Sequence, residues 1–300
     1  MPDPMPAVSL AAVPGRRART IELAAEIERR GFTGIWCPSF GDPMSLCLSM
    51  AHATDEITLA TSIEPIYFRE PHDLAAAAAY LHEISEGRFR LGLGVSHGPV
   101  HERLGLQVGP PLTDMREYVT ALAAAGGPAG GLPPIVLAAL RRKMTGLAVE
   151  VADGAVWANA ACSYMPTSLG VVPPDRRDRF IAANMVPTVI DDDLEAAAAV
   201  CRRTLTGYVA LPNYRNYWKA AGYEEEMTAI EKALAEGDGA SAEGAMSDEW
   251  LSDVTLHGGV GRVREGVERW FDSGTHPIVV PSSTSGGQMK ALEEVFAAFA

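Results

Sequence analysis

The feature that most constrains this chain is a repeated alternation of short apolar runs, each bounded by Gly or Pro, with longer amphipathic segments. Such alternation is typical of consecutive βα units, in which parallel strands are covered by helices. Eight parallel strands with interleaved helices close most simply into an α/β fold, the (β/α)8 TIM barrel, and a doubly wound open sheet is the alternative. The eight expected strands are residues 8–13, 34–38, 57–63, 88–95, 134–140, 155–160, 180–189 and 277–281.

Helices are expected between these strands, and Gly31, Gly87 and Gly207 stand just past three of their ends, where a left-handed residue often closes a helix. Residues 163–179 contain three prolines and are expected to form an irregular loop. A helical insertion at about 211–259 precedes the last strand, as a lid, an oligomer surface or a packing appendage. We expect one domain over residues 1–300. The expected helices are residues 16–30, 43–54, 71–86, 113–125, 142–152, 192–207 and 261–273.

Charge and cysteine usage limit the partners and the compartment. The chain has 38 acidic and 25 basic residues and a net charge of −13, which argues against nucleic acid, because phosphate backbones require clustered cations. Four cysteines without CxxC spacing exclude a zinc ribbon and indicate reduced thiols. There is no secretion signal, and no apolar run approaches the roughly 20 residues that span a bilayer. We therefore expect a cytoplasmic protein without a membrane or nucleic-acid partner.

In a (β/α)8 barrel the functional site lies where the strands end, so the residues that follow each strand are the candidates. After the third strand, Glu64 could be an acid or base, but a salt bridge at the rim is the simpler interpretation. The other candidates follow strands two, three, four, five, six and eight: Ser39 and Phe40; residues 62–67; Ser96 and His97; residues 141–143; Asn159; and residues 282–287.

Three consecutive cations, Arg141, Arg142 and Lys143, fall at the expected start of the helix after strand five. The partial positive charge of a helix N-terminus repels them. An anionic ligand such as a phosphate would relieve this repulsion and would use the free backbone N–H groups there. The alternative is a solvated basic patch.

Around strand four, Gly92, Gly94 and Gly98 give GxGxxxG spacing without a clear following helix, because Gly98-Pro99 interrupts it. We interpret these glycines as letting a flat ligand approach the strand, with barrel packing as the alternative. Zinc binding by His97 and His101 is disfavoured for the same reason. His97 suits a proton or hydrogen-bond donor, with a structural histidine as the alternative. No GxSxG elbow indicates a serine hydrolase.

Four segments in order resemble the luciferase-like flavin and deazaflavin oxidoreductase superfamily, and more specifically its branch that uses coenzyme F420. They are residues 30–36 (RGFTGIW), 85–97 (SEGRFRLGLGVSH), 111–118 (PLTDMREY) and 134–140 (PIVLAAL) followed by ADG at 152–154. The resemblance implies a barrel that binds an isoalloxazine-like ring at its mouth, with a phosphate tail at the helix after strand five. It also implies a non-proline cis peptide at Ser62–Ile63. The cofactor-binding residues that it implies are Phe40, Ser62, Ile63, Gly94, Val95, Ser96, Ala139, Leu140, Arg141, Arg142 and Lys143.

The implied activity is F420-dependent hydride transfer to or from a small organic substrate. His97 is the first candidate for the catalytic proton donor and Tyr67 the second. Phe40, Phe68 and Trp157, with Tyr67, could shape the pocket. The resemblance also implies a homodimer.

Two alternatives stay open at this point: an FMN-dependent monooxygenase of the same fold, and a non-catalytic ligand-binding barrel. The basic run favours F420, whose tail is anionic. Ser39-Phe40 stands where alcohol-oxidising relatives usually have Asp-His, which puts alcohol oxidation in doubt. Arg141-Arg142 stands where close relatives often have Gly-Pro, so the geometry around the tail is expected to differ.

Overall fold

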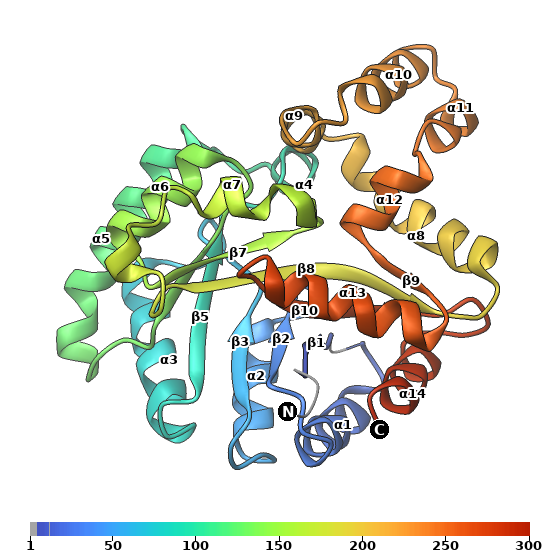
Figure 1. Cartoon of the computed structure of the whole chain (residues 1–300). Helices are drawn as coiled ribbons and strands as arrows, with labels where there is room; N and C mark the ends of the chain where they lie inside the picture. Colours follow the sequence, from blue (N-terminus) through green and yellow to red (C-terminus); the bar gives the residue numbers. More distant parts are fainter. Residues whose placement is uncertain (1–4, 12) are drawn as a thin grey trace. The chain divides into compact units, whose positions relative to one another are not determined.

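The computed structural model describes residues 5–11 and 13–300, and its strands form one ten-stranded sheet (Figure 1). The order is β10-β1-β2-β3-β5-β6-β7-β8-β9; β10 also pairs with β8, and β4 pairs with β5. This is the strand order of a (β/α)8 barrel, so the predicted fold class is confirmed and the open doubly wound sheet is wrong. The strands are β1 (Ala7–Ser9), β2 (Gly34–Cys37), β3 (Thr58–Thr61), β4 (Glu64–Pro65), β5 (Phe89–Gly94), β6 (Ile135–Ala138), β7 (Gly154–Ala158), β8 (Ile181–Ile190), β9 (Leu256–Gly258) and β10 (His276–Ser282).

The helices follow the expected ranges, with four additions: α4 (Gly98–Leu104), α7 (Met165–Leu169), α11 (Gly239–Gly244) and α14 (Gln288–Ala298). The expectation that Gly98-Pro99 prevents a helix is wrong, because proline in the first turn lacks only an N–H that would be unbonded there. Gly207 lies inside α8 and does not close it. The helices are α1 (Arg17–Arg29), α2 (Pro43–Ala51), α3 (Pro71–Ile84), α4 (Gly98–Leu104), α5 (Pro111–Ala129), α6 (Arg142–Val151), α7 (Met165–Leu169), α8 (Leu194–Val209), α9 (Pro212–Ala220), α10 (Glu224–Ala235), α11 (Gly239–Gly244), α12 (Asp248–Val254), α13 (Val260–Asp272) and α14 (Gln288–Ala298).

Residues 163–179, expected to be an irregular loop, are instead mostly short helical segments. Besides α7, they include part of the 3-10 turn Cys162–Tyr164 and the 3-10 turn Pro174–Arg176. Prolines are compatible with these segments because each helical piece is only three to five residues long, so little backbone hydrogen bonding is lost.

The chain divides into two compact units, which we describe separately. The N-terminal unit comprises residues 7–156 and 170–183, and the C-terminal unit comprises residues 157–169 and 184–300 with residues 5 and 6. The organisation as one domain stays a prediction.

In the N-terminal unit, β1, β2, β3, β5, β6 and the start of β7 pair in parallel and in sequence. Helix α3 lies beside α5 on the outside of β5 (Figure 1). The buried end of α2 is fixed by Arg88, whose guanidinium donates to the carbonyl oxygens of Ala51, Thr54 and Ile57 and to the Thr54 hydroxyl. This arginine therefore satisfies the Ala51 carbonyl at the end of α2 and two carbonyl groups of the segment that follows the helix.

In the C-terminal unit, the insertion before β10 contains α9 to α12 and the short strand β9. It is fastened to the segment that follows β7. The Trp218 indole donates to the Asn159 carbonyl at 3.0 Å, and the Ala161 N–H donates to the Tyr217 hydroxyl at 3.2 Å. Asp253 of α12 accepts from the backbone N–H and the hydroxyl of Ser163 at 2.9 and 2.7 Å. Within this unit, these contacts, of which those made by Trp218 and Tyr217 are buried, favour the interpretation as a packing appendage.

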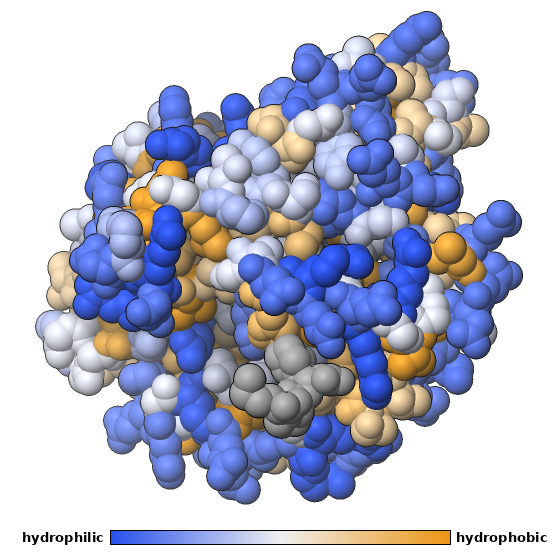
Figure 2. All heavy atoms as spheres, in the orientation of Figure 1, coloured by the Kyte–Doolittle hydropathy of each residue, from blue (hydrophilic) through white to orange (hydrophobic). Residues whose placement is uncertain are grey.

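The face drawn in Figure 2 is covered largely by hydrophilic residues, and its hydrophobic residues form small separate areas. This agrees with the acidic composition. Within residues 5–11 and 13–300, no helix combines the length and the apolar character that crossing a bilayer requires.

Candidate functional site

The chain turns sharply after β3, in the N-terminal unit. The Ser62–Ile63 peptide bond is cis, as the family resemblance implied. The Ser62 N–H donates to the Cys37 carbonyl oxygen at 2.6 Å, which ties the turn to the end of β2. Strand β4 follows directly and pairs with the last residues of β5, Glu64 opposite Leu93. The turn, the end of β2 and the end of β5 therefore meet at one rim of this unit.

Gly92 and Gly94 of β5 accommodate this turn. A Cβ atom on Gly94 would lie 2.6 Å from Cγ1 of Ile63, and one on Gly92 would overlap the Thr61 carbonyl oxygen. The Thr61 hydroxyl also donates to the Gly92 carbonyl at 2.8 Å and accepts from the Gly92 N–H at 2.9 Å. The space beside both glycines is thus filled by β3 and the turn, so barrel packing, the alternative interpretation, accounts for them better than approach of a ligand.

The end of β5 places His97 at the rim. Ser96 has a left-handed backbone with φ of 61°, which is uncommon without glycine and is often found at functional sites. His97 follows as the N-cap residue of α4 and is half-buried. Burial, and secondarily the nearby His101, lower the pKa of the His97 imidazole below its usual 6.5. The ring is therefore neutral at pH 7 and can donate one N–H.

His101 and Tyr67 form a second layer around this rim. Nε2 of His101 lies 2.6 Å from the Val95 carbonyl oxygen, and its ring meets Tyr67 edge to face at 5.3 Å. The Tyr67 hydroxyl donates to Oδ2 of Asp114 at 2.7 Å. Burial, together with this bond, raises the pKa of the Tyr67 phenol. Tyr67 thus holds its proton firmly, and its role as an alternative proton donor stays a prediction.

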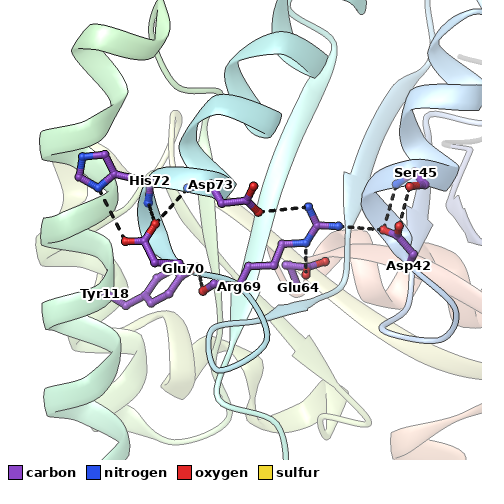
Figure 3. Close-up of polar contacts among 8 residues, drawn as sticks. All are labelled: Asp42, Ser45, Glu64, Arg69, Glu70, His72, Asp73 and Tyr118. Carbon is purple, nitrogen blue, oxygen red and sulfur yellow. Dashed lines mark hydrogen bonds and ion pairs between the residues drawn. The ribbon is translucent and has the colours of Figure 1, made fainter.

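A charged network follows the turn and is drawn in Figure 3. Arg69 contacts three carboxylates: Nε lies 3.2 Å from Glu64, and the terminal nitrogens lie 3.3 Å from Asp42 and 3.8 Å from Asp73. The Tyr118 hydroxyl of α5 donates to the Arg69 carbonyl at 2.9 Å. The expected salt bridge at Glu64 is present. Arg69 itself was not among the expected site residues, because it lies before the N-cap of α3 and no helical spacing connects it to its partners.

Two carboxylates of this region also start helices (Figure 3). Asp42 accepts from the backbone N–H of Ser45 at 3.1 Å and so caps α2. Glu70 accepts from the N–H groups of His72 and Asp73 and so caps α3. Because Arg69 binds Asp42 and precedes Glu70, the network fixes both helix starts relative to the turn.

Glu64 is the member of this network whose charge is least well compensated. Its side chain is buried, and Oε2 has no hydrogen-bond partner within the described part of the chain. Burial raises the pKa of Glu64 to about 7, because Arg69 offsets only part of the desolvation and Asp42 adds repulsion. The carboxyl group is therefore partly protonated near neutral pH.

Glu64→Gln is expected to stabilise the protein at pH 8 and to change its stability little at pH 5. The folded pKa of about 7 lies above the unfolded value, so the wild type loses stability as pH rises from about 4.5 to about 7. The loss is on the order of 1–3 kcal/mol, and the amide does not incur it. Urea unfolding of both proteins at pH 5 and pH 8 measures this difference.

Glu83→Gln, an exposed change on α3, is the matched control and should have the same small effect at both pH values. An equal effect of Glu64→Gln at pH 5 and pH 8 would show that Glu64 is ionised throughout this range.

The start of α6 completes the rim. Strand β6 pairs with β5, and a Cβ atom on Gly94 would lie 3.1 Å from that of Ala138, so residues 139–141 adjoin the end of β5. Arg141, Arg142 and Lys143 are exposed, and within residues 5–11 and 13–300 no carboxylate lies within ion-pair distance of them. The Arg141 side chain does not cap the helix. This end therefore presents free cations and free N–H groups.

The predicted site residues thus divide into two sets. The turn at Ser62–Ile63, the end of β5 and the start of α6 are neighbours in one unit. Phe40 lies on the loop after β2 and is 72% exposed, whereas Trp157 is buried in β7 and belongs to the C-terminal unit. Within the described residues, no three His, Cys, Asp or Glu side chains are grouped as a metal site would require.

The chain is similar to known proteins over most of its length. A family model described as luciferase-like monooxygenase matches residues 5–276. The 5,10-methylenetetrahydromethanopterin reductase of Methanolobus tindarius is 24% identical over 298 residues, covering 89% of this chain and 90% of that protein.

The solved structures that share the fold include the following two. The coenzyme F420-dependent tetrahydromethanopterin reductase of Methanopyrus kandleri superimposes with a TM-score of 0.76 at 19% identity, covering 98% of both chains. The oxygenating constituent of 3,6-diketocamphane monooxygenase from Pseudomonas putida, in complex with FMN, gives a TM-score of 0.63 at 16% identity, covering 99% of this chain and 98% of that one.

Proposed function

We propose that this chain, which belongs to the luciferase-like monooxygenase family, is an oxidoreductase that binds coenzyme F420 and catalyses hydride transfer to or from a small organic substrate. The observation that carries the proposal is the basic start of α6 beside the end of β5, whose cations have no ion-pair partner among residues 5–11 and 13–300. The similarity to an F420-dependent reductase supports it.

The residues at this rim fit such a cofactor. A phosphate with an anionic tail requires cations and backbone donors, and the α6 start offers Arg141, Arg142 and Lys143 together with N–H groups that the helix does not use. A flat ring requires a firm wall, which Ile63 can supply because the turn is wedged against Gly94. When bound, the deazaflavin supplies the hydride chemistry.

The protein's own residues would then bind the cofactor, orient the substrate and shield the site from water. Val95 and Ser96, which follow β5, would line the cofactor, and the contact of His101 with the Val95 carbonyl holds this segment in position. His97, neutral at pH 7 because burial lowers its pKa, donates an N–H to a polar atom of the substrate. The Tyr67 hydroxyl keeps its proton, which it donates to Asp114 in a hydrogen bond. Tyr67 would therefore contribute by its position at the rim.

FMN-dependent monooxygenation is the second candidate, supported by the fold shared with an FMN-bound monooxygenase. The same helix start would hold the FMN phosphate. F420 is favoured because three consecutive cations exceed what one phosphate needs. We also propose a cytoplasmic location and a homodimer.

Titration of the purified protein with F420 and with FMN tests the proposal. We expect F420 to bind at least about tenfold more tightly, a difference of about 1.4 kcal/mol. Tighter binding of FMN, with oxygen uptake on adding reduced FMN, would favour the monooxygenase. A folded protein that binds neither cofactor would overturn the proposed function.

A further inference from the structure

Two cysteines lie side by side behind the loop that follows β2. Cys37 is the last residue of β2 and Cys47 lies in the middle of α2. Their Sγ atoms are 3.6 Å apart, and both side chains are fully buried. They close a short segment, residues 38–46, which includes the exposed Phe40 and the α2 cap Asp42.

The other two cysteines have different surroundings. Cys162 contacts the Arg269 carbonyl oxygen at 3.6 Å, and Cys201 is buried in α8. Within the described residues, the contact between Cys37 and Cys47 is the only one that joins two thiols. It is therefore the one place where two cysteines are positioned to react with each other.

We propose that Cys37 and Cys47 are a dithiol modification site, at which exchange with a low-molecular-weight disulfide produces an intramolecular disulfide. The Cys37 thiolate attacks one sulfur of the reagent, giving a mixed disulfide and releasing one thiol. Cys47, as its thiolate, then attacks Sγ of Cys37 and releases the second thiol. In total the protein loses two protons and two electrons, that is, two hydrogen atoms, and the reagent is reduced to two thiols.

The geometry requires only a small rearrangement. The sulfur atoms must approach from 3.6 Å to the covalent distance of about 2.05 Å. Cys37 is followed by the half-buried Pro38 and then by the exposed residues Ser39, Phe40 and Gly41, whereas Cys47 lies inside α2. The exposed loop thus gives the reagent its shortest path from solvent, and this path reaches Cys37 before Cys47.

The environment makes the reaction slow rather than absent. Burial raises the pKa of the Cys47 thiol well above its usual value, and Cys37, Glu64 and Asp42 raise it further. A small thiolate fraction lowers the rate of exchange. The dithiol therefore survives brief exposure to oxidant and closes on prolonged exposure. The disulfide would fix the segment that carries Phe40, and this inference does not depend on the proposed cofactor.

The test incubates the folded full-length protein with excess oxidised glutathione in native buffer and follows its mass. We expect a slow loss of two hydrogens, and a proteolytic fragment that links the peptides containing residues 37 and 47. Cys201→Ser should behave as the wild type. Cys47→Ser should stop the loss and leave at most one glutathione on Cys37.

A second reagent tests the same pair of thiols in the wild-type protein, so its result does not depend on whether the variants fold. Phenylarsine oxide bridges two neighbouring thiols, and we expect the wild type to take up one equivalent across the same two peptides. The proposal is overturned if glutathione produces only mixed disulfides, if the link joins two chains or involves Cys162 or Cys201, or if the link forms only at urea concentrations that unfold the protein.

Discussion

Replacing Arg142 and Lys143 together by glutamate is expected to weaken F420 binding by roughly 100-fold or more. Each removed cation would forfeit a charge-assisted hydrogen bond to an anionic group, on the order of 1.5–3 kcal/mol. The new carboxylates would also repel the tail. Because both side chains are exposed and have no ion-pair partner in the described part of the chain, the fold should be unaffected. Fluorescence titration of the variant and the wild type measures the change in Kd.

The matched control is Arg16→Glu together with Arg17→Glu. These residues also stand at a helix start, that of α1, and are exposed. The charge change is the same, so a general effect of net charge on an anionic ligand appears in both variants. A specific tail site predicts a loss of less than about threefold in the control, since distant exposed charges are screened. Equal losses in both variants would contradict the tail site at α6.

The barrel strands could be predicted from sequence because parallel strands are buried on both faces and read as continuous apolar runs. Residues 34–38 were expected and β2 spans Gly34–Cys37, and residues 134–140 contain β6. The Gly31 and Gly87 positions were equally readable, and both have a φ of 82°. At Gly207 the same rule failed, because a helix can continue through an exposed glycine at modest cost.

The missed helices have physical causes. Helix α4 has no buried residue, so its sequence carries no apolar period. Helix α11 is six residues long with only Ala242 buried. Helix α14 differs, because Ala291, Leu292, Val295 and Phe296 are buried at helical spacing and could have been recognised.

The strand ends that form the site could be predicted from the sequence, but the contacts between its side chains could not. Barrel topology places strand ends at one rim, which is why the end of β5 and the start of α6 could be anticipated as neighbours. The partner of Tyr67 is Asp114, 47 residues further along, and no local pattern connects the two. Glu64 was recognisable as a rim carboxylate, but its raised pKa depends on burial, which only the packed structure reveals.

Burial of the turn also explains why β5 contains glycine at two positions. Gly92 faces the Thr61 carbonyl oxygen, a backbone atom held in β3. Gly94 faces the side chain of Ile63, which can shift. The two positions should therefore differ in their tolerance of an added methyl group, and Gly92 should be the less tolerant.

Gly92→Ala is accordingly expected to destabilise the protein by about 3 kcal/mol or more, the upper range for overpacking a core. The added Cβ must push β3 away from β5, which also strains the two hydrogen bonds between Thr61 and Gly92. Urea unfolding measures the loss. Because the turn at Ser62–Ile63 follows Thr61 directly, cofactor affinity should fall together with stability.

Gly207→Ala is the control for the general effect of replacing glycine. Its Cβ would meet nothing within 4 Å, and it lies in α8, so alanine should stabilise by about 0.5–1 kcal/mol. Opposite signs at the two positions would show that contact with β3, and not backbone freedom, requires glycine at 92. An unfolding midpoint for Gly92→Ala equal to that of the wild type would mean that β3 and β5 are further apart than the structure places them, and the wall that Ile63 forms would lose its support.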